Sequence, residues 1–525
     1  MIDVAVTKTK AEEPGEQSLK PKENLKQRAY LNGLTSIIDF AAVQITGLLV
    51  SPILVHTLGG VMYGAWKVIG QLTGYATLAD SRATQVLKWT IAKKKDIAGD
   101  EELRSDVTSA FFVTLFILPL ILIGGSVISW YAPYITRVDL QYYSLIRITC
   151  ALLLFSMVIA KVFDLFEAVL RGMNLGFKRM GMRSGIILGG GALKVFVITQ
   201  HYGLIGLAIV QIIITLVTGL TFYWIVKKTV GWFGFGKTSL KKVLYFCKLS
   251  GWNMANTITD TILTSSDKVL LGFIAGPMLV SSYALGTFLP LAIQGLLFRV
   301  IVGAIPGIGK LFGLQEYSKI YRVWDCMNGL IFLLTMATGV TVILFNNSFL
   351  KAWVGDGFFA DHLVNVLLVV MIFQDTLIRH DGFIINATLD LKRKVYLCFV
   401  SSIIFIAFGF ILIERLGIAG LCISLICSKF LLFVGQRRVL KNKMQYARAM
   451  APLNRMRPLA ASIFLLSCAS YISTFFETVS FIKMLVLAPL SFMLSFVFFY
   501  LVGLRKEQRV ELLAIISSIK LFKSN

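Results

Sequence analysis

Ionisable side chains stand inside long apolar stretches of this chain. Five cations among them are spread over helices of both halves of the sequence: Arg147, Lys161, Lys194, Arg379 and Lys429. A charged group at the centre of a lipid-spanning helix costs roughly 2.5–3.5 kcal/mol, so it normally faces a cavity or a partner. Arginine forks and lysine ammonium groups around a cavity would attract an anion, most naturally a phosphate. We therefore predict a cationic, substrate-binding cavity formed by these five residues.

Aspartates in the same stretches have two interpretations. Each could carry a coupling Na⁺ or H⁺, or could form an internal bridge to a lysine or arginine. Lys161 and Asp164 are spaced i, i+3 and Asp375 and Arg379 i, i+4, so each pair can meet on one helix face. Both interpretations stay open for the whole set: Asp39, Asp80, Asp164, Asp260, Asp267 and Asp375.

Motifs for enzymatic chemistry are missing from the sequence. The seven cysteines are scattered, without the paired spacing of a metal site. We find no nucleophile elbow, zinc-protease motif or phosphate-binding loop. The sequence therefore predicts no catalytic residue, no metal site and no cofactor beyond a coupling Na⁺ or H⁺, and it indicates that the protein is not an enzyme.

The elements that must hold these charges are membrane-spanning helices. The chain has 525 residues, is 56% hydrophobic and carries a formal net charge of +24. About fourteen apolar stretches have roughly the 20 residues that a helix needs to cross a bilayer. Because the cations flank apolar spans and do not gather on a soluble face, we exclude nucleic acid as a partner. The expected fold is an all-α polytopic membrane protein with about fourteen transmembrane helices.

Two repeats organise the predicted helices. An outer turn of small residues followed by an aromatic helix start occurs at Leu58–Gly60 with Tyr63, and again at Ala275–Pro277 with Tyr283. Transporters are commonly built from two such bundles with the substrate between them. The expected organisation is two pseudo-symmetric six-helix lobes plus two C-terminal helices. Its segments are a polar cytosolic tail (1–30), an N-terminal lobe (31–228), a cytosolic amphipathic linker (229–248), a C-terminal lobe (249–441), helices thirteen and fourteen (442–503), and a cytosolic amphipathic tail (504–525).

Lysine and arginine crowd into alternate gaps between the spans. Examples are Lys93–Lys95, Lys227 with Lys228, and Lys392–Lys394, whereas the intervening gaps are short and nearly bare. Cytoplasmic loops carry the excess of these residues. Both termini are therefore expected on the cytoplasmic side, and membrane lipid is an expected partner.

The run Leu58-Gly59-Gly60-Val61-Met62-Tyr63-Gly64-Ala65-Trp66, followed by Leu78-Ala79-Asp80, gives the chain a family resemblance. It resembles the oligosaccharide flippases, the polysaccharide transporter branch of the multidrug/oligosaccharidyl-lipid/polysaccharide exporter superfamily. Asp267-Lys268 with Gly276 and Tyr283 resembles the second-half version of the pattern. One departure is visible: relatives tend to have Asp-x-Gly where this chain has Asp80-Ser81-Arg82.

The resemblance implies a flippase of the bacterial inner membrane that moves undecaprenyl-pyrophosphate-linked oligosaccharide repeat units by alternating access. The product would serve O-antigen, lipopolysaccharide or related surface polysaccharide biosynthesis, with a polysaccharide polymerase and a chain-length regulator as further partners. Two alternatives in the same superfamily are an ion-coupled multidrug exporter and a peptidoglycan lipid-precursor flippase. A membrane glycosyltransferase or polymerase is the enzyme alternative, but the outer gaps are too short to house its chemistry.

Overall fold

Helices make up almost all of the structure, a computed structural model that describes residues 25–76, 83–387, 391–443, 452–475 and 480–521. No strand occurs in these segments. The helices of the first half are α1 (Leu25–Ala76), α2 (Ala83–Lys94), α3 (Asp100–Thr136), the short η2 (Leu140–Tyr142), α4 (Tyr143–Gly172), α5 (Gly176–Thr199) and α6 (Gly203–Thr229). Those of the second half are α7 (Leu240–Ser265), α8 (Asp267–Ala275), α9 (Pro277–Gly286), α10 (Phe288–Gly313), α11 (Tyr317–Val354), α12 (His362–Ala387) and α13 (Leu391–Lys443). The chain ends with α14 (Pro452–Ser473), α15 (Phe481–Phe498), η3 (Phe499–Gly503) and α16 (Lys506–Leu521).

The length and apolar composition of these helices confirm an all-α polytopic membrane protein. Within the described residues, 10 helices are long and apolar enough to cross a membrane, or up to 11 if the bent pair α9–α10 counts as one span. Two of the 10 are double-length helices, broken at Gly59 in α1 and at Gly417 in α13. Within the described residues, the predicted apolar stretches fall on these helices, and the one at 61–92 comprises the second half of α1 and most of α2.

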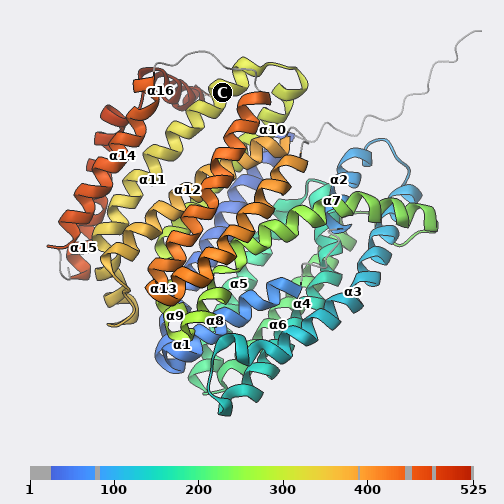
Figure 1. The fold of residues 1–525 in the computed structure, drawn as a ribbon. Coiled ribbons are helices and arrows are strands. Elements are labelled where there is room, and N and C mark those ends of the chain that lie inside the picture. The colour runs from blue at the N-terminus through green and yellow to red at the C-terminus, as the bar shows by residue number, and fades with distance from the viewer. Residues whose placement is uncertain (1–24, 77–82, 388–390, 444–451, 476–479, 522–525) are drawn as a thin grey trace, which may run out of the picture.

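The helices form two groups that meet along α1, α3 and α7–α9 (Figure 1). In the first group α1 packs on α5, and α4 packs on α3 and α6. In the second, α12 packs on α10 and α13, and α11 carries α14, α15 and α16 on its other side. The turn between the two halves of α1 lies beside α8 and α9 at one end of the bundle, and α2 and α16 lie toward the other (Figure 1). We call these the glycine-turn end and the cation-rich end.

The two outer turns that the sequence suggested as repeats have the same backbone. Gly59 has φ 77° and ψ 162°, and Gly276 has φ 86° and ψ 167°. A positive φ combined with this extended ψ is open only to glycine. The equivalence of the two turns supports a duplicated architecture, in which each repeat reverses its first pair of helices through the same glycine conformation.

The second part of the predicted amphipathic linker belongs to a longer helix. From the sequence, the stretch Lys237–Lys248 could lie on the membrane surface or pack on the protein. In the structure α7 begins at Leu240 and runs without a break to Ser265, so Leu240–Lys248 form its first turns. Residues 230–239 are held against α3: Arg104 Nε donates to the Trp232 carbonyl at 2.7 Å, and the Ser109 and Thr238 hydroxyls lie 2.6 Å apart. The amphipathic pattern reflects packing on α3, because Val243 and Phe246 join its apolar cluster.

The C-terminal tail is also packed on the protein. Arg505 pairs with Asp325 of α11, and the Gln508 amide donates to the Asp325 carbonyl at 3.1 Å. Leu512 is buried in the apolar cluster beneath it. Helix α16 is therefore fixed to α11 through one face.

Candidate functional site

Helices α4 and α5 bring charged residues to a common space in the N-terminal group. Arg183 and Lys194 fall on one face of α5, and Lys161, Asp164, Glu167 and Arg171 form a stripe along α4. A cavity of about 390 Å³ lies among the four helices α1, α4, α5 and α6. Its charged lining is Asp164, Glu167, Arg171, Arg183 and Lys194. This volume is within the range of about 300–1,000 Å³ that is typical of ligand sites.

Small residues in α5 explain how Lys194 reaches this cavity. A side chain at Gly190 would meet Ile214 of α6, and one at Gly191 would meet Thr46 of α1, so both helices approach α5 closely there. Lys194 follows one turn later and its ammonium group donates to the Gln211 side-chain oxygen at 3.1 Å. The glycine run thus sets the three helices around the lysine.

A second cavity of about 150 Å³ lies between α2 and α4. It shares Asp164, Glu167 and Arg171 with the first cavity and adds Lys88 of α2 and Lys161 of α4. The two cavities therefore lie on either side of the charged stripe of α4. We refer to them together as the N-terminal site.

Most charges of the N-terminal site are paired. Glu167 bridges Arg171 and the buried Arg179. Asp39 pairs with Arg183 at 2.9 Å, and Asp164 pairs with Lys161 at 3.4 Å.

Two lysines of this site differ from the rest, because neither Lys88 nor Lys194 has a carboxylate within ion-pair distance among the described residues. The site therefore carries positive charge that its own carboxylates do not neutralise.

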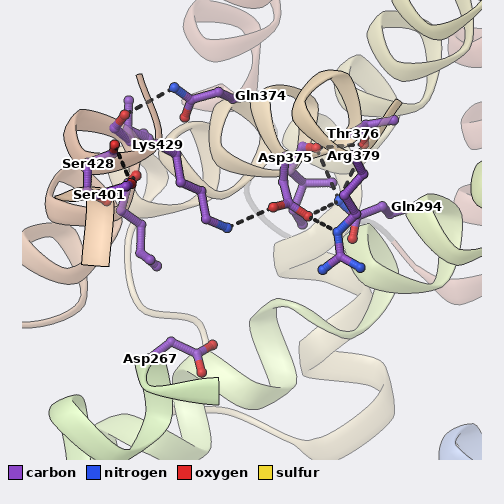
Figure 2. A network of polar contacts seen from close by, with 12 residues as sticks. Asp267, Gln294, Gln374, Asp375, Thr376, Arg379, Ser401, Ser428 and Lys429 are labelled. Carbon is purple, nitrogen blue, oxygen red and sulfur yellow. Dashed lines mark hydrogen bonds and ion pairs between the residues drawn. The ribbon is translucent and has the colours of Figure 1, made fainter. Parts of the chain in front are cut away.

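The second group of helices holds a separate charged cluster around Asp375 of α12. Lys429 Nζ of α13 lies 2.8 Å from one carboxylate oxygen, and Arg379 Nε lies 2.7 Å from the other. The Gln294 amide also donates to the second oxygen, at 3.0 Å. Figure 2 shows Lys429 and Arg379 approaching Asp375 from different sides. Asp375 therefore serves as the counter-ion of two cations.

Asp267 of α8 faces the same cluster across a cavity of about 110 Å³ that Arg379 and Lys429 also line (Figure 2). One of its oxygens accepts a hydrogen bond from the Tyr283 hydroxyl at 2.9 Å. The other is buried without a hydrogen-bond partner in the described part of the chain. Asp267 thus differs from Asp39, Asp164 and Asp375, because no lysine or arginine of the described segments pairs with it, and its second oxygen remains available to a proton or a cation.

The five cations predicted to form one cavity occupy three places. Lys161 and Lys194 line the N-terminal site, and Arg379 and Lys429 line the cavity around Asp375. Arg147 lies elsewhere: its guanidinium stacks 4.0 Å from the Trp130 ring centre and donates to the Trp130 carbonyl.

The aspartates with two open interpretations also separate. Asp39, Asp164 and Asp375 form bridges to Arg or Lys, whereas Asp267 forms none with the side chains that the structure describes. Asp80 and the side chain of Asp260 lie outside the described residues. A search of the described residues for three or more His, Cys, Asp or Glu side chains that could hold a metal ion found none.

Sequence reasoning missed several residues of the N-terminal site. Arg171 and Arg183 are not among the five predicted cavity cations, yet both line the larger cavity. Gln211 was not singled out, although it forms a polar row with Thr215 and Thr218 on one face of an otherwise apolar helix. The i, i+4, i+7 spacing of these polar residues in the sequence could have indicated that this helix face lines a cavity.

Solved structures with this architecture define the class of protein. The lipid II flippase MurJ in an inward closed conformation superposes with a TM-score of 0.67 at 15% identity, covering 89% of this chain and 98% of that chain. An inward-facing multidrug resistance MATE family transporter of the MOP superfamily gives a TM-score of 0.58 at 14% identity, covering 80% and 96%. A MOP superfamily transporter from Pyrococcus furiosus, described as having a binding pocket of reversed polarity, gives 0.53 at 14%, covering 80% and 97%. The chain has the fold of these membrane transporters.

Within that class, residues 33–312 match the family model of the polysaccharide biosynthesis proteins, and the chain belongs to this family. No curated protein matches the sequence. The predicted polysaccharide transporter family and the transporter fold are confirmed together.

Proposed function

We propose that this protein is a flippase that moves undecaprenyl-pyrophosphate-linked oligosaccharide repeat units across the bacterial inner membrane for O-antigen or related surface polysaccharide. Membership of the polysaccharide biosynthesis family and the flippase and transporter fold support this proposal. The single observation that carries the choice of an anionic cargo is the unpaired positive charge of the N-terminal site at Lys88 and Lys194. A pyrophosphate beside Lys88 would supply part of the missing negative charge.

The arrangement of charges suggests how the substrate is held. Lys88, Lys161 and Arg171 surround the smaller cavity, where three cations face two carboxylates. Arginine offers two parallel donors to phosphate oxygens, and lysine adds a mobile point charge. In this proposal the pyrophosphate binds here, the oligosaccharide extends into the larger cavity, and the prenyl chain stays in lipid.

The contact between the lobes suggests alternating access. At the glycine-turn end, Ser281 of α9 donates to the Gly60 carbonyl of α1. Gly64 and Pro277 pack together beside this bond. Because closely packed interfaces have discrete arrangements, separating these contacts would open that end while the opposite end closes. In this proposal the glycine-turn end faces the periplasm and both termini face the cytoplasm, as the positive-inside pattern of the sequence predicts.

Coupling to Na⁺ or H⁺ is part of the proposal, with Asp267 as the residue that would take the ion. Its partner-free oxygen favours it over Asp375, whose two oxygens are occupied. A polysaccharide polymerase and a chain-length regulator remain expected partners, because the flipped repeat units must be joined.

The alternatives predict different phenotypes. A multidrug exporter would offer carboxylates to cationic compounds, but the N-terminal site pairs its carboxylates with arginine and lysine. Its loss would sensitise cells to dyes and antibiotics. A peptidoglycan-precursor flippase also suits a cationic cavity, and its loss would stop growth.

Complementation tests the proposal in cells. A strain lacking the gene should lose surface polysaccharide, accumulate lipid-linked repeat units and keep growing. Lys88→Gln combined with Lys194→Gln should fail to restore polymer, whereas Arg147→Gln should restore it. Normal polymer with the double variant at normal protein level would exclude the N-terminal site as the binding site.

A further inference from the structure

We propose that the cargo carries a second negative charge, a carboxylate on a sugar well separated from the pyrophosphate, and that Lys194 and Gln211 recognise it. This inference rests on the proposed function and specifies its substrate class. It follows from the order of the cations along the larger cavity. Arg171 and Arg183 lie near the end of α4 and the start of α5, and Lys194 lies three turns further along α5, toward the glycine-turn end.

The two levels of positive charge are too far apart to serve one anion. Arg183 and Lys194 share a face of α5 and are separated by roughly 16 Å at a rise of 1.5 Å per residue. A pyrophosphate cannot span this distance. If the pyrophosphate binds among the cations near the cation-rich end, a different part of the substrate meets Lys194.

Lys194 also differs from the arginines of this cavity in lacking a carboxylate counter-ion among the described residues. Arg171 and Arg183 have Glu167 and Asp39 as counter-ions, whereas the one polar contact of the Lys194 ammonium within the described residues is the neutral amide of Gln211, at 3.1 Å. Lys67 of α1 lies near enough to repel it. A partly buried ammonium without a counter-ion is unfavourable, and a bound anion would remove this cost.

A carboxylate fits this position better than a phosphate. One lysine and one amide provide a single positive charge and one amide NH₂ group, which together suit a singly charged group. Phosphate recognition commonly uses arginine forks, and these gather at the other level of the cavity.

The surrounding side chains suit a sugar ring. Gln211, Thr215 and Thr218 present polar groups along one face of α6, and the rings of Phe163 and Phe222 line the same cavity. The hydroxyl of Thr46, on the α1 wall, is buried without a hydrogen-bond partner in the described segments. Polar groups beside aromatic faces can meet the hydroxyls and the apolar face of a sugar. The combination of this lining with Lys194 points to an acidic sugar of the uronic acid type.

Binding of two matched lipids to the purified full-length protein tests the inference. One probe is a short-chain prenyl pyrophosphate carrying a trisaccharide that ends in glucuronic acid, and the other ends in glucose. We expect the wild type to bind the acidic probe about tenfold more tightly, since a charge-assisted hydrogen bond is worth roughly 1.5–3 kcal/mol. Lys194→Gln should remove this preference without changing the affinity for the probe that ends in glucose. Lys194→Arg should retain the preference.

Gln211→Glu provides a second, independent variant. It leaves Lys194 in place but gives it an internal carboxylate, so it should also remove the preference for the acidic probe. Equal binding of both probes by the wild type, or an equal loss of both in Lys194→Gln, would overturn the inference while leaving the flippase proposal intact. Failure of the wild type to bind even the probe that ends in glucose would overturn both the inference and the flippase proposal.

Discussion

The carbonyl group of Pro277 lies where a side chain on Gly64 would have to be. A Cβ placed on Gly64 would overlap the Pro277 carbonyl oxygen and carbon, and the Ser281 hydroxyl lies beside them. Gly64 belongs to the second half of α1 and Pro277 begins α9, so the contact joins the two lobes. The obstacle is backbone and cannot rotate away. The closed glycine-turn end therefore depends on the absence of a side chain at this position.

Gly64→Ala should disfavour the closed glycine-turn end. Overpacking of a tight contact typically costs about 1–3 kcal/mol, which corresponds to roughly a tenfold or larger shift between conformations. We expect transport to fall and cysteines placed across α1 and α9 to crosslink less efficiently.

Gly70→Ala is the matched control for this variant. Gly70 lies on the same helix, and no atom of the described residues lies within 4 Å of a Cβ placed on it. Unchanged transport and crosslinking in Gly64→Ala, at the level of Gly70→Ala, would show that the contact is not part of the transport cycle.

Asp375→Asn should destabilise the protein. The substitution leaves Lys429, which is 10% exposed, without its counter-ion, and breaking such a pair costs about 3–5 kcal/mol. We expect a fall of several degrees in the midpoint of thermal unfolding in detergent. Adding Lys429→Met should recover part of the loss, because no unpaired ammonium then remains buried.

Asp356→Asn is the control for an ion pair in an exposed position. Asp356 pairs with Lys351 at 3.1 Å with 79% of its side chain exposed, so its loss should change stability by less than about 1 kcal/mol. Equal effects of the two aspartate substitutions would contradict the counter-ion role of Asp375.

Arg147→Gln should leave transport near the wild-type level. Its guanidinium stacks on Trp130 and lies apart from the charged cavities, so the loss removes a contact worth about 0.5–1 kcal/mol.

Lys194→Gln, at a comparable protein level, should lower transport of an acidic repeat unit about tenfold. Polysaccharide output in the complemented strain measures both, and a larger loss with Arg147→Gln would place the substrate path elsewhere.

The helices and their boundaries were largely readable from the sequence, because lipid forces backbone groups into helices and apolar length then reports each span. The break at Gly59 was visible as a turn of small residues. The start of α7 could not be predicted from the sequence. An amphipathic stretch has the same pattern whether its apolar side meets lipid or another helix, and Val243 and Phe246 meet α3.

The candidate site was harder to predict. Helical spacing indicated that Lys161 can meet Asp164 and Arg379 can meet Asp375, since both pairs lie within one helix, and both pairs form. Bridges between helices, such as Asp39 with Arg183, depend on packing that one sequence does not encode locally. Arg147 lies inside an apolar stretch, as the other four cations do. The sequence alone does not show that its partner is Trp130, which the structure places 4.0 Å from the guanidinium.

Translocation by the purified protein in liposomes tests the central claim most directly. A fluorescent prenyl-pyrophosphate oligosaccharide is placed in both leaflets, and a membrane-impermeant quencher reports the fraction that reaches the outer leaflet. The account predicts protein-dependent exposure of the inner pool, slowed at least about tenfold by Lys88→Gln with Lys194→Gln and unaffected by Arg147→Gln. Exposure no faster than in empty liposomes, or equal rates for the wild type and the double variant, would contradict it.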